Sequence, residues 1–299
     1  MIAKLITMGL PAIPTWMVHK VASRYVAGEN KQDAIALAAK LRRQGFATTL
    51  DVLGEDVKNV EKARRSLSDY IDLMDAMGQA GVDRNISIKL TMLGLRIDEV
   101  FAFESFSQLL AEAAARDFFV CIDMEDSSVT DTTLKFYMRA KPTWPKLGTV
   151  LQARLRRTVE DAERLAAPGT NFRLCKGIYL EPETLAHQKG LIINDAFMDT
   201  LSILLTKGSY VAIATHDPVL IKRAGALLQA FPEYRGRYEY QALLGVPFSK
   251  TLKALRQAGN TVRIYIPFGR DWHAYSMRRL RENPDIALHI VKGLFSLDR

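Results

Sequence analysis

The sequence has only two cysteines among its 299 residues, so no disulfide framework can hold the fold together. Both of them, Cys121 and Cys175, lie in apolar strand-like runs, and we expect them to be buried side chains rather than metal ligands. The five histidines are scattered along the chain, which disfavours a metal site. The chain also lacks an uninterrupted apolar stretch long enough to span a bilayer.

Low-complexity segments and long Pro/Gly/Ser linkers are absent as well, which favours a single domain. Hydrophobic residues make up 48% of the chain and charged residues 25%, a composition typical of a globular protein with a substantial core. Acidic residues are in the minority, and the formal net charge is +8. Because the basic residues are spread along the whole chain, we expect mostly solvated charge and no nucleic-acid partner.

The first 18 residues resemble a signal peptide only superficially. Pro11 and Pro14 interrupt the apolar run, and Lys4 is its one basic residue. We expect a loosely packed leading helix in a cytoplasmic protein. The basic surface is compatible with a peripheral contact at the inner face of the plasma membrane.

Strand-like and helical patterns alternate eight times along the chain. Apolar, β-branched and aromatic runs predict strands at 46–53, 85–93, 118–124, 147–153, 171–178, 209–214 and 238–244, and from 261 until Pro267 and Gly269 end it. Helical spacing predicts helices at 31–44, 66–81, 104–116, 131–140, 158–167, 182–205, from 218, 249–258 and 272–282. Thr158 would open its helix as part of a capping box, and Asp217 would cap the helix that Pro218 begins.

Eight strand–helix units predict an α/β fold, a closed TIM-like (β/α)8 barrel with extra N-terminal helices. We assign residues 1–45 to N-terminal helices packed on the barrel and residues 46–299 to the barrel, as one structural domain. A doubly wound open sheet is the alternative, but no Gly-x-Gly-x-x-Gly fingerprint follows any strand.

The C-terminal ends of barrel strands are where active sites form. Polar or charged residues are expected there from all eight strands: Asp51, Glu55, Lys89, Asp123, Glu125, Gln152, Arg154, Arg173, Lys176, Tyr179, Thr215, His216, Glu239, Gln241 and Tyr265. Buried charge is costly unless it is paired or used, so this set indicates a functional barrel mouth. Its cations, with Gln, Thr and His, suit a large anionic cofactor, and redox chemistry would need one because these side chains accept no hydride.

The predicted helix at 272–282 follows the last strand and carries Tyr275, Arg278 and Arg279. Guanidinium groups are planar and grip carboxylates through paired hydrogen bonds, so adjacent arginines near an aromatic ring suit a small carboxylate ligand. Taken alone, this helix is explained better by a solvated basic face. The polar strand ends elsewhere in the chain favour the ligand site, with Lys89 as a third cation.

Eight short segments in order resemble the proline dehydrogenase family, the flavin-dependent barrel also found in the bifunctional proline utilization A proteins. They are residues 50–55 (LDVLGE), 86–91 (ISIKLT), 122–124 (IDM), 151–154 (LQAR), 173–179 (RLCKGIY), 214–216 (ATH), 263–267 (RIYIP) and 275–283 (YSMRRLREN). Together they cover the chain from about residue 20 onwards. Since 299 residues leave no room for an aldehyde dehydrogenase domain, the chain looks monofunctional.

The resemblance implies FAD across the barrel mouth and oxidation of L-proline to Δ1-pyrroline-5-carboxylate, the first step of proline catabolism. A hydride would pass to flavin N5, and a membrane quinone would accept the electrons. By the same resemblance the cofactor contacts are Met124, Gln152, Arg173, Lys176, Gly177, Ile178, Thr215 and His216. Asp123 and Arg173 match the catalytic positions. The substrate residues are Lys89, Arg278, Arg279, Tyr179, Tyr265 and Tyr275, and Glu55 with Arg278 matches an ion pair that closes the site.

Two positions depart from the family pattern. Ile178 stands where alanine is usual, and Asp217 stands where asparagine is usual, so that Asp217 is expected to serve only as a helix cap.

Two other functions fit the residues without the resemblance. One is an aldolase or lyase that uses Lys89 or Lys176 as a Schiff-base amine. The other is a non-catalytic basic binding protein for nucleic acid or membrane.

Overall fold

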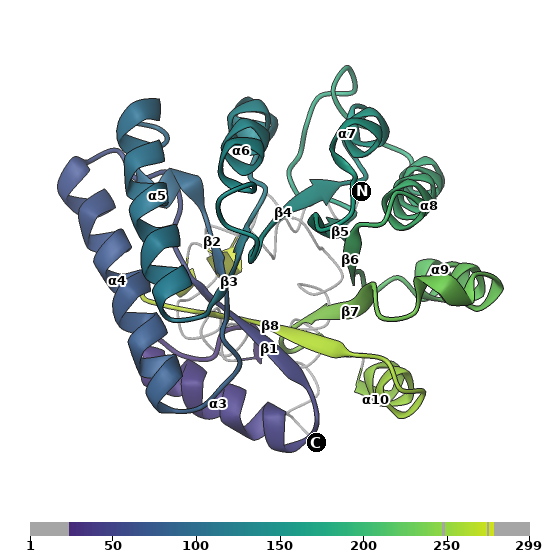
Figure 1. The fold of residues 1–299 in the computed structure, drawn as a ribbon, viewed down its shortest axis with the longest axis horizontal. Helices are drawn as coiled ribbons and strands as arrows, with labels where there is room; N and C mark the ends of the chain where they lie inside the picture. Colours follow the sequence, from purple (N-terminus) through teal and green to yellow (C-terminus); the bar gives the residue numbers. More distant parts are fainter. Residues whose placement is uncertain (1–23, 247–248, 274, 278–299) are drawn as a thin grey trace, which may run out of the picture.

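The computed structural model describes residues 24–246, 249–273 and 275–277, in which eight parallel strands close into a barrel in chain order (Figure 1). The strands are β1 (Ala47–Val52), β2 (Asn85–Ile88), β3 (Phe119–Ile122), β4 (Leu147–Gln152), β5 (Asn171–Cys175), β6 (Tyr210–Ala214), β7 (Tyr238–Leu243) and β8 (Val262–Phe268). Each strand pairs in parallel with the next, and β8 closes on β1. The predicted TIM-like (β/α)8 barrel is confirmed.

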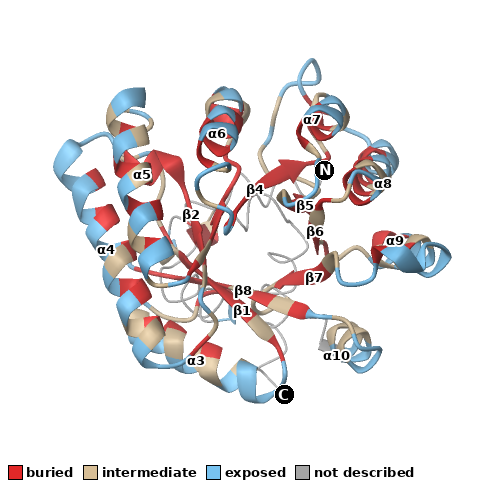
Figure 2. Cartoon of the chain, viewed as in Figure 1, coloured by how far each residue is buried: buried red, intermediate tan, exposed pale blue. Residues whose placement is uncertain are grey.

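Helices form a ring outside the strands (Figure 1). They are α3 (Lys31–Arg43), α4 (Val60–Gln79), α5 (Glu99–Ala115), α6 (Ser127–Ala140), α7 (Thr158–Leu165), α8 (Gly190–Thr206), α9 (Pro218–Ala230) and α10 (Ser249–Gln257), with short 3-10 turns η2 (Leu90–Leu93) and η3 (Pro232–Tyr234). On α4 the buried residues recur every three or four positions, from Ala63 to Met77, and face the barrel. Figure 2 shows the strands buried and the outer helix faces exposed.

Side-chain caps explain why several helices begin before their apolar periodicity does. Asn59 accepts hydrogen bonds from the backbone N–H groups of Glu61 and Lys62, and Asp98 accepts one from Phe101. Asp126 and Asp217 cap α6 and α9 in the same way. A cap of this kind stabilises a helix by about 1 kcal/mol. The helices predicted to start at 66, 104 and 131 therefore start at Val60, Glu99 and Ser127.

Three local predictions are wrong because tertiary contacts decide the conformation. Strand β2 ends at Ile88, and the buried residues that follow form η2, whose turn closes at Gly94 with a φ of 102°. Residues 182–189 do not form a helix, because Ala186 pairs with Leu155 in an antiparallel bridge and α8 begins at Gly190. Thr158 makes no capping box; its hydroxyl donates to the carbonyl of Gln152 instead.

The last strand runs on through Pro267, which was predicted to end it. Pro267 lies opposite Asp51 of β1, whereas β7 reaches only as far as Tyr265. Beyond Tyr265 the strand therefore has no β7 partner to which an N–H would have to donate, and a proline fits there. Cys121 is buried as expected, but Cys175 is only half-buried.

Helix α3 packs against β1 and β8 on the outside of the barrel. The remainder of the N-terminal segment assigned to residues 1–45 lies partly outside the described residues, and the division at residue 45 stays a prediction. Among the described helices, none combines the length and the apolar character needed to cross a bilayer.

Candidate active site

A buried lysine between two aspartates forms the centre of the barrel mouth. Lys89 directly follows β2, and its Nζ lies 2.7 Å from Oδ1 of Asp51 and 3.5 Å from Oδ2 of Asp123. Burial alone would lower the pKa of Lys89, but the two carboxylates outweigh it and raise the pKa well above its ordinary value. The same burial raises the pKa of Asp51, which the charge of Lys89 opposes. Lys89 is therefore a permanent ammonium in this setting.

Arg173 extends the cluster across the barrel from β5. Its Nη1 is paired with Oδ1 of Asp123, and its Nη2 donates to Oγ of Ser87 over 2.8 Å. Tyr265 of β8 donates its hydroxyl to the other oxygen of Asp123 over 2.7 Å, and the Arg173 guanidinium lies 5.1 Å from the Tyr265 ring centroid. Asp123 thus accepts hydrogen bonds from Lys89 after β2, Arg173 of β5 and Tyr265 of β8. These three donors fix its carboxylate in one orientation.

The residues predicted to bind a cofactor lie at or after the ends of β3, β4, β5 and β6, except Arg173, which lies within β5. Gln152 donates from Nε2 to the Glu125 carbonyl over 2.9 Å. Gly177 has a φ of +95°, and a Cβ at this position would lie 2.9 Å from Gln152 Oε1, so the backbone passes close to that side chain. Thr215 accepts from the Asp217 N–H, and His216 accepts at Nε2 from the Leu243 N–H over 3.0 Å. These bonds hold the loops after the strands in place.

Asp217 does more than cap α9. Its Oδ1 accepts from Val219 N at 2.8 Å, as expected of the cap. Its Oδ2, however, lies 2.5 Å from Lys176 Nζ and 3.2 Å from Asn194 Nδ2. The expectation that Asp217 serves only as a cap is therefore wrong, because it is also the ion-pair partner of a predicted cofactor contact.

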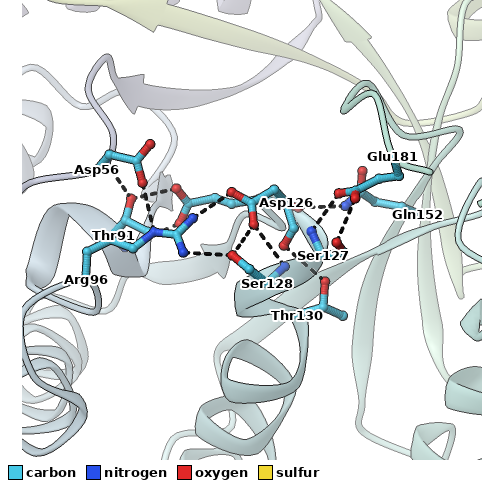
Figure 3. A network of polar contacts seen from close by, with 10 residues as sticks. Asp56, Thr91, Arg96, Asp126, Ser127, Ser128, Thr130, Gln152 and Glu181 are labelled. Atoms are coloured by element: carbon cyan, nitrogen blue, oxygen red, sulfur yellow. Dashed lines mark hydrogen bonds and ion pairs between the residues drawn. The ribbon is translucent and has the colours of Figure 1, made fainter. Parts of the chain in front are cut away.

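A polar network joins the loops after β1, β2 and β3 (Figure 3). Thr91 donates its hydroxyl to Glu125 over 2.6 Å and accepts from the N–H of Asp56 over 3.0 Å. Arg96 bridges Asp56 and Asp126 with distances of 2.9 and 2.6 Å. Burial raises the pKa of Glu125 to about 7. The segment that carries Glu55 is thereby tied to the loop that follows β3.

The remaining predicted site residues are described by their burial and their neighbours in the fold. Tyr179 and Ile178 are half-buried after β5, Glu55 is half-buried after β1, and Met124 is buried beside Asp123. Tyr275 packs in a small cluster with Val26 and Leu53. Arg278 and Arg279 lie outside the described residues, so the carboxylate clamp and the Glu55–Arg278 gate stay predictions.

Several of the residues assigned to strand ends lie inside the strands instead. Arg173 is the third residue of β5, and Glu239 is the second residue of β7. Asp51 was predicted to lie at a strand end, but its pairing with Lys89 was not predicted. Ser87 and Arg263 were not predicted as site residues. Their alternation with apolar neighbours gave a signal that they face the barrel interior, but not which partners they meet there.

The family model described as "Proline dehydrogenase" matches residues 34–290 of this chain. The chain belongs to the proline dehydrogenase family. Proline dehydrogenase 1 of Bacillus subtilis subsp. natto is 34% identical over 273 residues, which are 91% of this chain and 90% of that protein. Proline dehydrogenase of Deinococcus radiodurans is 34% identical over 279 residues, with coverage of 92% and 90%. This member of the proline dehydrogenase family is thus an enzyme, and its match spans about nine-tenths of each of these two relatives.

Longer proteins match through only part of their length. The bifunctional protein PutA of Escherichia coli is 27% identical over 309 residues, covering 88% of this chain and 23% of that protein. The crystal structure of PutA from Bdellovibrio bacteriovorus inactivated by N-propargylglycine superposes with a TM-score of 0.81 at 22% identity, over 87% of this chain and 32% of that one. At that identity the likeness shows the fold alone.

Proposed function

We propose that this protein catalyses the FAD-dependent oxidation of L-proline to Δ1-pyrroline-5-carboxylate, the first step of proline catabolism. The observation that carries the proposal is the buried cluster of Lys89, Asp123, Arg173 and Tyr265 at the barrel mouth. These four side chains lie in or directly after four different strands, and together with Asp51 they set two cations against two carboxylates. In a proline dehydrogenase family member, this arrangement supports a small substrate that carries a carboxylate.

The proline carboxylate would be held by Lys89 together with Arg278 and Arg279. Lys89 stays charged at neutral pH, because the neighbouring carboxylates raise its pKa. The two helix arginines would add paired donors for the two carboxylate oxygens. Tyr265, fixed by its bond to Asp123, would present its ring to the pyrrolidine, with Tyr179 and Tyr275 on other sides.

The residues at the mouth fit a flavin nucleotide. Arg173 and Lys176 are cations suited to an anionic ligand, and Gly177 next to Lys176 lets the backbone lie close to Gln152, where a Cβ would clash. Arg173 would lie near the reactive end of the ring, and Gln152, Met124, Ile178, Thr215 and His216 would complete the contacts. FAD, when bound, supplies at flavin N5 the acceptor for the hydride that leaves the ring carbon beside the proline nitrogen.

The protein's own part in the reaction is positioning and exclusion of water. Proline would react as the free amine, whose lone pair stabilises the cation that develops as the hydride leaves. Asp123 already accepts three hydrogen bonds, so we assign it to orienting Lys89, Arg173 and Tyr265 rather than to proton abstraction. Closure by Glu55 and Arg278 would exclude water from the developing charge.

A Schiff-base aldolase or lyase is less compatible with this geometry. Such enzymes need an unprotonated lysine amine. The ion pair with Asp51 and the raised pKa of Lys89 oppose this, and Lys176 is paired with Asp217.

A membrane quinone is proposed as the electron acceptor, reached by peripheral contact from the cytoplasmic side. The net charge of +8 supports attraction to an anionic membrane surface. Binding to vesicles of anionic lipid that weakens steeply with salt would support this route, and equal binding to neutral vesicles would contradict it.

An absorption spectrum of the purified protein, before and after anaerobic addition of L-proline, tests the function. Flavin bands that bleach with proline support cofactor, substrate and reaction class together. Flavin that stays oxidised would contradict the substrate, and a colourless protein that FAD does not reconstitute would contradict the cofactor. Arg279→Ala should raise the proline KM at least about tenfold and leave FAD bound, whereas the surface control Arg164→Ala should change neither.

A further inference from the structure

The N-terminal end of the barrel contains a cavity of about 320 Å³. Residues at the starts of strands line it, among them Asn85, Phe119 and Asn171, and it reaches inward to Arg173 and Gln241. On this side Arg173 therefore borders open space instead of close-packed side chains. Packing alone cannot fix a guanidinium group beside a cavity, so its orientation has to come from hydrogen bonds.

Two residues of β7 supply such bonds from the cavity side. The Arg173 Nε donates to Oε1 of Gln241 over 2.7 Å, and Gln241 Nε2 donates to Oε1 of Glu239 over 2.6 Å. Both ends require the same amide orientation, because Arg173 can only donate and an ionised Glu239 can only accept. The Gln241 oxygen must therefore face Arg173.

Glu239 is itself fixed by groups from two other strands. Arg263 of β8 donates to both of its carboxylate oxygens over 2.8 and 3.0 Å, and the Tyr210 hydroxyl lies 3.2 Å from Oε2. Arg263 in turn donates to the Thr48 carbonyl of β1 over 2.9 Å. A continuous chain of hydrogen bonds thus runs from the backbone of β1 to the guanidinium of Arg173.

We infer that Gln241 and Glu239 are positioning residues for Arg173, holding its guanidinium from the cavity side while Asp123 and Ser87 hold it from the substrate side. The inference rests on the proposed function, in which Arg173 contacts the reactive end of the flavin. Neither β7 residue needs to touch substrate or cofactor. Their effect passes through the direction in which Arg173 presents its N–H groups.

Exchanging the amide of Gln241 and the carboxylate of Glu239 tests this inference. Gln241→Glu places two carboxylates face to face and should disrupt the chain. The double variant Gln241→Glu/Glu239→Gln restores the acceptor for Arg173 and the bond between the two β7 residues with its direction reversed. The single amide oxygen at position 239 keeps only one of the two bonds from Arg263. Gln241→Leu removes the acceptor altogether. Tyr240→Leu, a buried change between the two residues on the opposite face of β7, controls for general loss of stability.

Each protein is stripped of flavin and titrated with FAD, and the reconstituted enzyme is assayed with proline. Gln241→Glu and Gln241→Leu should weaken FAD binding about tenfold, shift the flavin absorption bands, and lower kcat by about 10- to 100-fold with the proline KM within about threefold of wild type. The double variant should regain part of the FAD affinity and kcat, because the acceptor for Arg173 is held again while one bond from Arg263 is lost. Tyr240→Leu should keep the wild-type FAD affinity and kcat, even where its melting temperature falls as much as that of the Gln241 variants.

Wild-type FAD affinity and absorption bands in both single variants would overturn the inference, as would a double variant no better than Gln241→Glu. These flavin measurements need no substrate. A wild-type protein that binds FAD but is not reduced by proline would therefore contradict the proposed substrate, while the FAD titrations would still decide the role of β7.

Discussion

The buried carboxyl of Glu125 should make the protein lose stability as the pH rises from about 4.5 to about 7. Only 4% of the residue is exposed, and its oxygens contact the N–H and hydroxyl of Thr91 at 3.3 and 2.6 Å. Burial raises the pKa of Glu125 from an ordinary value of 4.5 to about 7, although the bonds from Thr91 and the charge of Lys89 oppose this rise. The folded protein therefore keeps a proton that the unfolded chain releases.

The size of the effect follows from the two pKa values. Between them the folded state binds more protons than the unfolded state, so the free energy of unfolding falls with rising pH. One pKa unit corresponds to about 1.4 kcal/mol, so this carboxyl removes roughly 3 kcal/mol of stability across the window. The stability is fully present below the unfolded pKa and is lost by the time the pH exceeds the folded pKa.

Thermal unfolding of wild type and Glu125→Gln, measured from pH 5 to pH 8 with FAD in the buffer, tests this reasoning. For a chain of this size, about 3 kcal/mol corresponds to roughly 5 °C. The melting temperature of the wild type should fall by about that much more than that of the variant. Glu104→Gln, an exposed change on α5, should follow the wild type. Parallel curves for wild type and Glu125→Gln would refute the argument.

Three further outcomes are expected. Asp217→Asn keeps the cap of α9 but removes the carboxylate paired with Lys176, so FAD should bind several-fold more tightly in a fluorescence titration; weaker binding would contradict the pairing argument. Lys89→Met should keep FAD but raise the proline KM at least about tenfold, because Asp51 loses its ion-pair partner and Asp123 keeps only Arg173, which leaves excess negative charge beside the substrate carboxylate; an unchanged KM in steady-state kinetics would exclude that role. Burial raises the pKa of Cys121 to about 12, so an aromatic disulfide reagent should modify Cys175 in the native protein and reach Cys121 only on unfolding; equal native rates would contradict this.

The barrel could be predicted from the sequence because its signal is local and repeated. An apolar run predicts each strand, and the spacing of apolar residues predicts each helix. The number of strand–helix repeats was then enough to infer that the barrel is closed. The errors fall where a tertiary contact competes with local preference. Residues 182–189 were predicted to be helical, but Ala186 among them pairs with Leu155. Residues 89–93 were predicted to be strand, but Leu90–Leu93 form η2.

The site was predictable in its residue types but not in its pairings. Family resemblance drew attention to Lys89, Asp123 and Arg173, and the structure places them together. Their other partners come from far along the chain: Gln241 lies 68 residues from Arg173, and Arg263 meets Thr48 across 215 residues. Such contacts depend on the register of strands around the barrel, which no single segment encodes.

Charge inside this network is already balanced by the protein's own side chains. Its three acids and three bases are Asp51, Asp123 and Glu239 with Lys89, Arg173 and Arg263. A substrate carboxylate therefore adds a negative charge that Lys89 alone cannot neutralise, because two aspartates already share its ammonium group. Further cations are needed, and we propose that Arg278 and Arg279 supply them. In this proposal Lys89 would decide where the carboxylate lies, whereas the two arginines would provide most of the net attraction.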